Sequence, residues 1–199
     1  MKSSAIWITI FGIISVISGY LILNQSQSDG KAKSIPVDTS SVGAPASPIF
    51  GLVLPDSTGH AQALEQWRGK ILVVNYWATW CPPCREEMPG FARLQAKFAA
   101  KGVQFVGISI DTAVKVAEFQ KETPVNYPLL IGDTGAIDSS VALGNSRQAL
   151  PFTAVIDRQG RVAAVKLGRF TEADLEPELV GLVSHSPQWM PSPDRAPGT

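Results

Sequence analysis

Cysteine and histidine are scarce in this sequence. Its 199 residues contain two cysteines, Cys81 and Cys84, and two histidines, His60 and His185. A structural zinc site needs four ligands, and two of them would have to be histidines that lie far from the cysteines along the chain. We therefore expect no metal site. A Thr-x-x-Cys element with a separate resolving cysteine is also lacking, which disfavours a peroxidase.

The sequence also lacks an excess of either positive or negative charge. Seventeen basic residues cancel seventeen acidic residues, and no long run of either sign occurs. Nucleic-acid binding depends on clustered Lys and Arg, so we expect no nucleic-acid partner. Hydrophobic residues make up 45% of the chain and charged residues 17%. This composition and length suit one globular domain with short extensions.

One long apolar run is present near the start of the chain. Residues 5–23 carry no charge and are long enough to cross a bilayer once. A cleavable signal peptide is the alternative, but no convincing small-x-small cleavage site follows, and no cysteine follows that would indicate a lipoprotein. We predict a transmembrane anchor in residues 1–23. Lys2 before the run and Lys31 and Lys33 after it leave its orientation undecided.

Two segments are too poor in large apolar residues to build a core. Residues 24–48 are rich in Ser, Gln, Pro, Gly and Ala, which predicts a flexible linker. Residues 185–199 contain four prolines and no hydrophobic periodicity, which predicts a disordered tail. The globular domain is therefore expected to span residues 49–184.

The two cysteines follow directly on the most apolar strand of the chain. Residues 71–77 are β-branched and aromatic, as in a strand buried on both faces with parallel neighbours. Pro82 and Pro83 suit the first turn of a helix, where a backbone N–H has no partner in any case. Cys81 is therefore predicted at a helix N-terminus, where the helix dipole favours the thiolate.

Cys84 lies about one helical turn beyond Cys81 on the same face. It can close a disulfide with Cys81 or resolve a mixed disulfide formed there. A purely structural disulfide is the alternative, but a loop of this length constrains little chain. We interpret the pair as a redox-active dithiol.

The remaining pattern predicts alternating strands and helices, which indicates an α/β fold. A proline at position 89 is expected to kink the long helix after the cysteines, and Gly102 to end it. The predicted strands are residues 49–54, 60–64, 103–110, a short strand within 126–133, 153–157 and 161–167; the predicted helices are 81–101, 113–122, 137–143 and 171–183.

A family resemblance rests on two motifs. Residues 75–89, centred on Trp80-Cys81-Pro82-Pro83-Cys84, and residues 149–157, Ala-Leu-Pro-Phe-Thr-Ala-Val-Ile-Asp, resemble thioredoxin-fold oxidoreductases of the TlpA and ResA type. The resemblance covers roughly residues 49–184. It implies a thioredoxin-like α/β fold, with a central mixed sheet flanked by helices, an N-terminal hairpin and an inserted βα segment.

The resemblance also implies roles for residues outside the dithiol. Pro151 corresponds to a cis proline that lies against the dithiol, and the neighbouring Leu150 would contact substrate as an added strand does. Without the resemblance, a proline that begins a strand is usually a turn residue. Trp80 and Pro82 are expected to form the apolar rim on which substrate sits, whereas Trp77 is expected in the core.

Glu87 is the candidate acid–base residue. Asn75 occupies the position at which cytosolic thioredoxin carries a buried acid, and relatives of the TlpA and ResA type use a glutamate three residues after the second cysteine, which Glu87 matches. Partial burial would raise its pKa towards working pH. The alternative is a surface charge on the helix. Its neighbour Glu86 is expected to face solvent.

Together these features predict a membrane-anchored protein-disulfide oxidoreductase outside the cytoplasm. The resemblance implies a reductase that needs no cofactor beyond the Cys81–Cys84 disulfide. Its expected partners are protein disulfide substrates, such as apocytochrome c or an oxidase copper-site protein, and a membrane electron donor. The alternatives are a disulfide-forming oxidase, a copper-delivery protein and a holdase on the same fold. A holdase would tolerate Cys81→Ser, and the enzyme would not.

Overall fold

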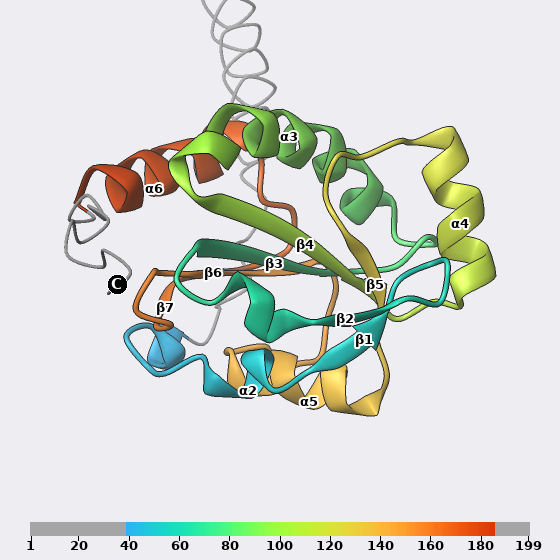
Figure 1. Cartoon of the computed structure of the whole chain (residues 1–199), viewed down its shortest axis with the longest axis horizontal. Helices are drawn as coiled ribbons and strands as arrows, with labels where there is room; N and C mark the ends of the chain where they lie inside the picture. Colours follow the sequence, from blue (N-terminus) through green and yellow to red (C-terminus); the bar gives the residue numbers. More distant parts are fainter. Residues whose placement is uncertain (1–38, 186–199) are drawn as a thin grey trace, which may run out of the picture. The chain divides into compact units, whose positions relative to one another are not determined.

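The structure is a computed structural model that describes residues 39–185. Its main strands are β3 (Ile71–Trp77), β4 (Val103–Ser109), β5 (Leu129–Ile131), β6 (Phe152–Ile156) and β7 (Val162–Leu167). They form one sheet in the order β5-β4-β3-β6-β7. The pairs β3–β4 and β4–β5 are parallel, whereas β3–β6 and β6–β7 are antiparallel (Figure 1). The predicted central mixed sheet is confirmed.

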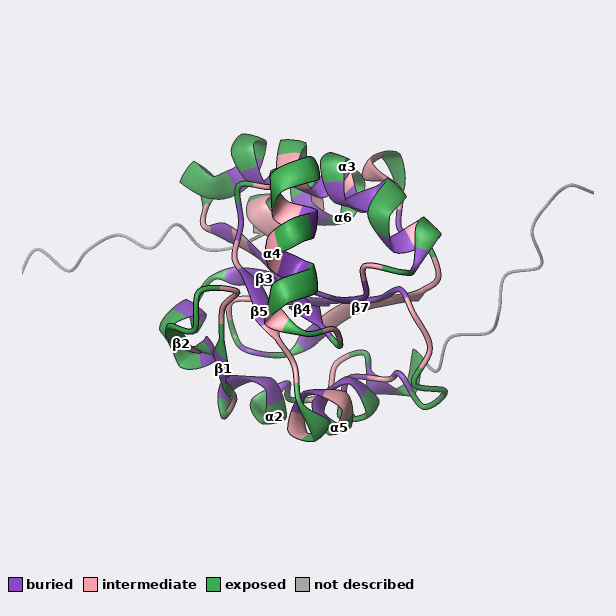
Figure 2. Cartoon of the chain, turned by 90° about the vertical axis from the view of Figure 1, so that its right-hand side faces the viewer, coloured by how far each residue is buried: buried purple, intermediate pink, exposed green. Residues whose placement is uncertain are grey.

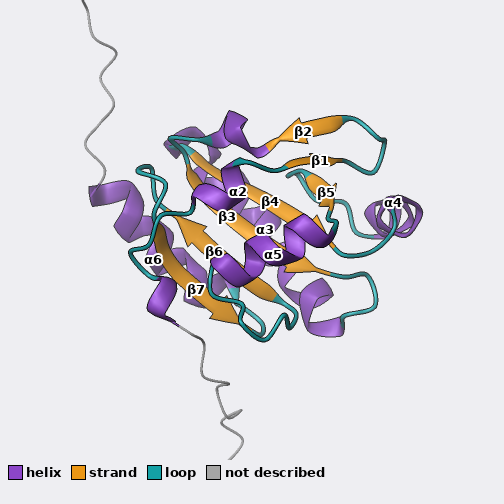
Figure 3. Ribbon diagram, turned by 90° about the horizontal axis from the view of Figure 1, so that it is seen from below, coloured by secondary structure: helices purple, strands orange, loops and turns teal. Residues whose placement is uncertain are grey.

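Helices cover both faces of this sheet. They are α2 (Ser47–Phe50), α3 (Pro82–Phe98), α4 (Ala113–Glu122), α5 (Thr134–Ala142) and α6 (Glu172–His185). One face carries α3 and α6, and the opposite face carries α2 and α5 (Figures 1 and 3). Burial follows this layering, since the buried residues of the helices lie on the sides that face the sheet (Figure 2).

All seven residues of β3 are buried. This strand lies at the centre of the sheet, so alternate side chains enter different cores. Val73 and Trp77 join the core beneath α3, and Leu72 and Tyr76 join the core on the side of α5. The apolar run read in the sequence is therefore a strand with two buried faces, and Trp77 lies in the core as expected.

The long helix begins where the cysteine motif predicts. Cys81 is the N-cap of α3, Pro82 opens the first turn, and Pro89 lies inside the helix. The helix ends at Phe98, earlier than predicted, and continues as the 3₁₀ turn η3 (Ala99–Lys101). Gly102 follows with a φ of 80°, a left-handed conformation that glycine adopts at little cost.

The segment before β3 corrects one prediction and confirms another. The expected strand over residues 49–54 is wrong in its first half, because residues 47–50 form α2 and the strand β1 spans only Val53–Pro55. A short apolar run does not distinguish a strand from a buried helical turn. The predicted hairpin is confirmed, since β1 pairs antiparallel with β2 (Ala61–Ala63).

The end of the predicted linker is also folded. A 3₁₀ turn, η1, spans Thr39–Ser41. The Gly43 N–H then donates to the Val162 carbonyl at 2.8 Å, and the Ala46 N–H donates to the Gly160 carbonyl at 2.8 Å. These contacts use backbone groups and small residues, which composition does not reveal. The ordered domain therefore begins before residue 49.

The described residues contain no helix that is long and apolar enough to cross a membrane. The predicted anchor in residues 1–23 lies outside the described residues, as do residues 24–38 of the predicted linker and residues 186–199 of the predicted tail. Residue 185 is the last residue of α6.

We predict that Gly107→Ala destabilises the domain. A Cβ at Gly107 in β4 would lie 2.6 Å from Leu129 Cδ2 and 3.1 Å from Trp77 Nε1. Overpacking of this kind costs about 1–3 kcal/mol. The matched control is Gly181→Ala in α6, where a Cβ meets no atom within 4 Å and the gain in helix propensity is about 0.5–1 kcal/mol. Urea unfolding should give opposite signs for the two variants.

Candidate functional site

The dithiol lies where β3 gives way to α3. Cys81 and Cys84 are joined by a disulfide with an S–S distance of 2.02 Å. Cys81 is 4% exposed and Cys84 is fully buried, whereas the adjacent Trp80 is 64% exposed. Pro82 is exposed as well. The disulfide therefore has an exposed aromatic residue and an exposed proline beside it.

The helix start offers Cys81 few backbone donors. An N-cap side chain normally accepts from the N–H of the second or third helical residue. The first two residues of α3 are Pro82 and Pro83, which have no N–H. The Cys81 side chain has no capping hydrogen bond. A thiolate here has the helix dipole in its favour but fewer donors than an ordinary N-cap supplies.

Asp111 fixes the turn that precedes the disulfide. Its Oδ2 accepts from the Thr79 N–H and from the Thr79 hydroxyl, both at 2.8 Å. Trp77 and Ser109 are register partners in the parallel pair β3–β4, so Thr79 and Asp111 each stand two residues beyond the end of their strands. These hydrogen bonds lower the pKa of Asp111, although its burial acts in the opposite direction.

Pro151 lies at the same end of the sheet. The Leu150–Pro151 peptide bond is cis, and Phe152, the next residue, pairs with Tyr76 near the end of β3. Leu150 is partly buried and packs against both cores. The Pro151 carbonyl accepts from the Gly168 N–H at 2.8 Å. Leu150 and Pro151 therefore lead into β6, the strand beside the one that leads to the cysteines.

Glu87 is a buried carboxyl group one turn beyond Cys84. It is 3% exposed, so the alternative of a surface charge is wrong. Asn75 Nδ2 donates to its Oε1 at 2.7 Å, and the Phe170 N–H donates to its Oε2 at 2.8 Å. Burial raises the pKa of Glu87 to about 7, with the Phe170 and Asn75 hydrogen bonds and the charge of Arg169 acting in the opposite direction.

Two buried polar groups around Glu87 have spare hydrogen-bonding capacity. Asn75 Nδ2 also donates to Thr153 Oγ1 at 3.0 Å, but Asn75 Oδ1 has no partner within residues 39–185. The Tyr127 hydroxyl likewise has none in that range. Burial, and secondarily the charge of Glu87, raise the pKa of Tyr127. The carboxyl group therefore sits among polar side chains beneath α3 rather than among purely apolar ones.

The structure brings together the residues that the sequence singled out. Cys81, Cys84, Trp80 and Pro82 come from the start of α3 and the turn before it, Glu87 from the next turn, and Leu150 and Pro151 from the segment just before β6. Glu86 faces outward and pairs with Arg169 at 3.0 Å. Groups of three or more His, Cys, Asp or Glu side chains suited to a metal ion are absent from residues 39–185.

Sequence reasoning missed several partners of the site. Asn75 was noted as a replacement for an acid, not as a donor to Glu87. The Phe170 N–H is a backbone group and carries no sequence signal. Asp111 does carry a sequence signal. The C-terminal ends of adjacent parallel strands lie side by side, so residues at equal distances beyond those ends lie close together.

The comparisons agree with this geometry. Residues 34–180 match the Redoxin family. The chain belongs to the Redoxin family. A thiol-disulfide oxidoreductase ResA of Geobacillus kaustophilus is 30% identical over 128 residues, which are 64% of this chain and 71% of that protein. As a Redoxin protein similar to ResA, the chain is a thiol-disulfide oxidoreductase with a thioredoxin-like fold.

Solved structures of Redoxin-like relatives share this fold. A thiol:disulfide interchange protein of Chlorobium tepidum TLS has a TM-score of 0.62 and 27% identity, covering 76% of this chain and 99% of its own. A secreted thiol-disulfide isomerase of Corynebacterium glutamicum has a TM-score of 0.58 and 27% identity, covering 66% of this chain and 85% of its own.

We predict that ionisation of Glu87 makes the domain less stable as pH rises. A carboxyl group whose pKa is raised from 4.5 to about 7 on folding binds its proton more tightly in the folded state. Its contribution to stability is complete below pH 4.5 and is lost as pH rises to about 7, a loss of about 3 kcal/mol.

Urea unfolding of the oxidised protein between about pH 4.5 and pH 8 checks this expectation. In Glu87→Gln the loss should be absent, so that the variant gains stability relative to the wild type as pH rises. The exposed Glu178→Gln serves as the control and should keep the wild-type slope. Parallel pH profiles for the wild type and Glu87→Gln would contradict the prediction.

Proposed function

We propose that this oxidoreductase is a reductase of protein disulfides that acts outside the cytoplasm through its Cys-Pro-Pro-Cys dithiol. The observation that carries the proposal is the buried Glu87 carboxyl group one helical turn beyond Cys84, together with the exposed Trp80 beside Cys81. A dithiol with its own buried acid and an accessible apolar neighbour can exchange disulfides with a folded or unfolded client.

The proposed cycle starts from the reduced dithiol. The Cys81 thiolate attacks a client disulfide, and one client sulfur leaves as a thiolate that takes a proton from water. The Cys84 sulfur then attacks Cys81 in the mixed disulfide, while its proton passes to the Glu87 carboxylate and the second client sulfur leaves. The client gains two electrons, and the Cys81–Cys84 disulfide forms.

Two features of the site favour the reducing direction. A strong oxidant is one whose reduced form is stabilised, and stabilisation of the Cys81 thiolate requires donors. Pro83 is the second helical residue, so one of the two backbone N–H groups that would supply them is missing. The buried Glu87 disfavours a second negative charge nearby when it is ionised. Both effects weaken the reduced form and make the couple more reducing.

Next to Pro151, one residue has backbone groups left to pair with a client strand. The Ala149 N–H and carbonyl are both bonded to the Asn145 side chain, at 3.1 and 3.2 Å. The Pro151 carbonyl is bonded to Gly168. We therefore assign client pairing to the backbone of Leu150, with the rings of Trp80 and Pro82 as the apolar contact on the other side of the disulfide.

The sequence outside the described residues supports the proposed location and electron supply. Residues 1–23 contain an apolar run of membrane-spanning length, and the relative from Corynebacterium glutamicum is described as secreted. A reductase outside the cytoplasm needs electrons from inside. We therefore propose a membrane protein that re-reduces the Cys81–Cys84 disulfide, with no cofactor besides that disulfide.

We predict that the two cysteines behave differently towards a disulfide-bonded peptide. Cys84→Ser should accumulate a stable mixed disulfide, because the resolving sulfur is missing. Cys81→Ser should form little, because Cys84 is fully buried. Non-reducing electrophoresis and mass spectrometry read the adduct. Equal trapping by both variants would contradict the roles assigned to the two cysteines. Protection of an unfolded client from aggregation that is undiminished in both variants would indicate a holdase.

The reduction potential of the Cys81–Cys84 pair decides the direction of electron flow between this protein and its client. Equilibration of the protein in glutathione or dithiothreitol buffers, read by thiol alkylation, should give a reduction potential of roughly −270 mV, as in thioredoxin. A reduction potential of roughly −120 mV would make the protein a disulfide-forming oxidase instead. Pro83→Ala restores a backbone donor and should raise the potential relative to the wild type.

A further inference from the structure

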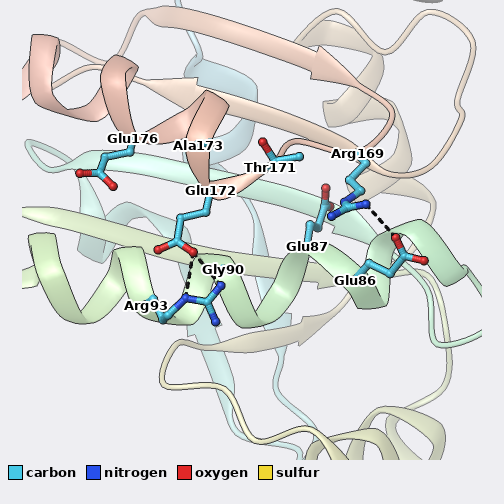
Figure 4. A pocket seen from close by; sticks show the side chains of 9 residues that line it. All are labelled: Glu86, Glu87, Gly90, Arg93, Arg169, Thr171, Glu172, Ala173 and Glu176. Carbon is cyan, nitrogen blue, oxygen red and sulfur yellow. Dashed lines mark hydrogen bonds and ion pairs between the residues drawn. The ribbon is translucent and has the colours of Figure 1, made fainter. Parts of the chain in front are cut away.

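A pocket connects the buried Glu87 to solvent on a side of α3 that the dithiol does not share. Its volume is about 440 Å³, and its lining residues come from α3, the β7–α6 connection and α6. They are Glu86, Glu87, Gly90, Arg93, Arg169, Thr171, Glu172, Ala173 and Glu176 (Figure 4). Glu87 is 3% exposed, whereas most of the other side chains that line the pocket reach solvent.

The start of the β7–α6 connection contacts two adjacent carboxyl groups. The Arg169 side chain pairs with the exposed Glu86 at 3.0 Å, and the next backbone N–H, that of Phe170, donates to the buried Glu87 at 2.8 Å. Figure 4 shows the Arg169 side chain between the carboxyl groups of Glu86 and Glu87. Arg169 is therefore a cation placed at the solvent side of the buried acid.

When a protein client is bound, the proton of Glu87 needs a separate route to solvent. In the mixed disulfide the client covers Cys81, Trp80 and the backbone of Leu150, none of which lines this pocket. Glu87 has to be ionised at that stage to accept the proton of Cys84, so any proton that it already carries must leave while the client is bound. The pocket provides an opening to solvent that a client bound at Trp80 does not cover.

We propose that this pocket is the path by which Glu87 exchanges its proton with solvent, and that Arg169 is the positioning residue that controls this exchange. The proposal rests on the proposed function of Glu87 as the acid that serves Cys84. Arg169 favours the ionised carboxylate and so promotes proton release. Glu86 shares the Arg169 charge and limits the effect.

Several other charged or titratable groups surround Glu87. They are Glu86 and Arg93 on α3, Tyr127 before β5, Arg169 before α6, and Glu172 and Glu176 on α6. Arg93 lines the same pocket, but its partner is Glu172, at 2.6 Å. Arg93 is therefore a control of equal charge and similar exposure.

Direct titration of the Glu87 carboxyl carbon by NMR, in the full-length oxidised protein, tests the role of Arg169. Arg169→Gln should raise the Glu87 midpoint, because the nearby cation is lost. Glu86→Gln should lower it, because a nearby anion is lost and Arg169 is no longer shared. Arg93→Gln should leave it near the wild-type value. Added salt should shrink the first two shifts, since Arg169 is half exposed.

Opposite shifts separate an electrostatic role from a structural one. Loosening of the β7–α6 connection would move the midpoint in the same direction in Arg169→Gln and Glu86→Gln, because both break the same ion pair. That result, or an unchanged midpoint in both variants, would overturn the inference. Lys166→Gln in β7 is a second control that removes a cation outside the pocket.

Turnover of a disulfide-bonded peptide separates this inference from the proposed function. If Glu87 serves Cys84, the pH profile of turnover should move with the NMR midpoint in Arg169→Gln and Glu86→Gln. Midpoints that shift while the pH profile stays fixed would uphold the role of Arg169 and reject that of Glu87 in catalysis.

Obstruction of the pocket tests the path itself. Ala173 is exposed at its wall, and Ala173→Trp fills space without a change of charge. We expect turnover to slow several-fold and to acquire a larger solvent deuterium isotope effect, because proton release becomes limiting. Ala173→Ser keeps the pocket open and should match the wild type. Equal rates and isotope effects for both variants would reject the path.

Discussion

The burial of a single carboxyl group is the constraint on which this site depends. Glu87 lies between the active-site helix and the sheet, where an ionised carboxylate is costly unless its oxygens are bonded. One oxygen is bonded by the side chain of Asn75 from β3, and the other by the backbone of Phe170 before α6. Three segments far apart in the sequence are therefore held together by one acid. Their separation would leave a charge buried without partners.

The same requirement explains the arrangement along β3. Asn75 and Trp77 face α3, whereas Tyr76 between them faces α5 and exchanges a hydrogen bond with Ser139 at 2.7 Å. The strand thus presents a polar group to the acid and apolar groups on either side of it. Gly107, the register partner of Asn75 in β4, keeps space for Trp77. Active-site chemistry and core packing use alternate residues of one strand.

Sequence patterns predicted the parts of the molecule that depend on local order. The limits of β3 and α4 follow from apolar runs and from turn residues, and Cys81, Cys84 and Glu87 share one helical face because of their spacing. Family resemblance singled out Glu87 and added Pro151. The failures have physical causes. Residues 47–50 form a helix because Ile49 and Phe50 are buried in a tertiary core, and residues 43–46 are ordered by backbone bonds to β7 and the turn before it.

The hydrogen bonds of Gly43 and Ala46 also determine the end of the domain at which these residues lie. They attach the chain next to Gly160 and Val162, where β6 ends and β7 begins. Register places that turn beside Leu72 at the start of β3, and the disulfide lies beyond the other end of β3. A strand of this length spans roughly 20 Å. Residues 43–46 therefore join the domain near one end of β3, and the sulfur atoms lie beyond the opposite end.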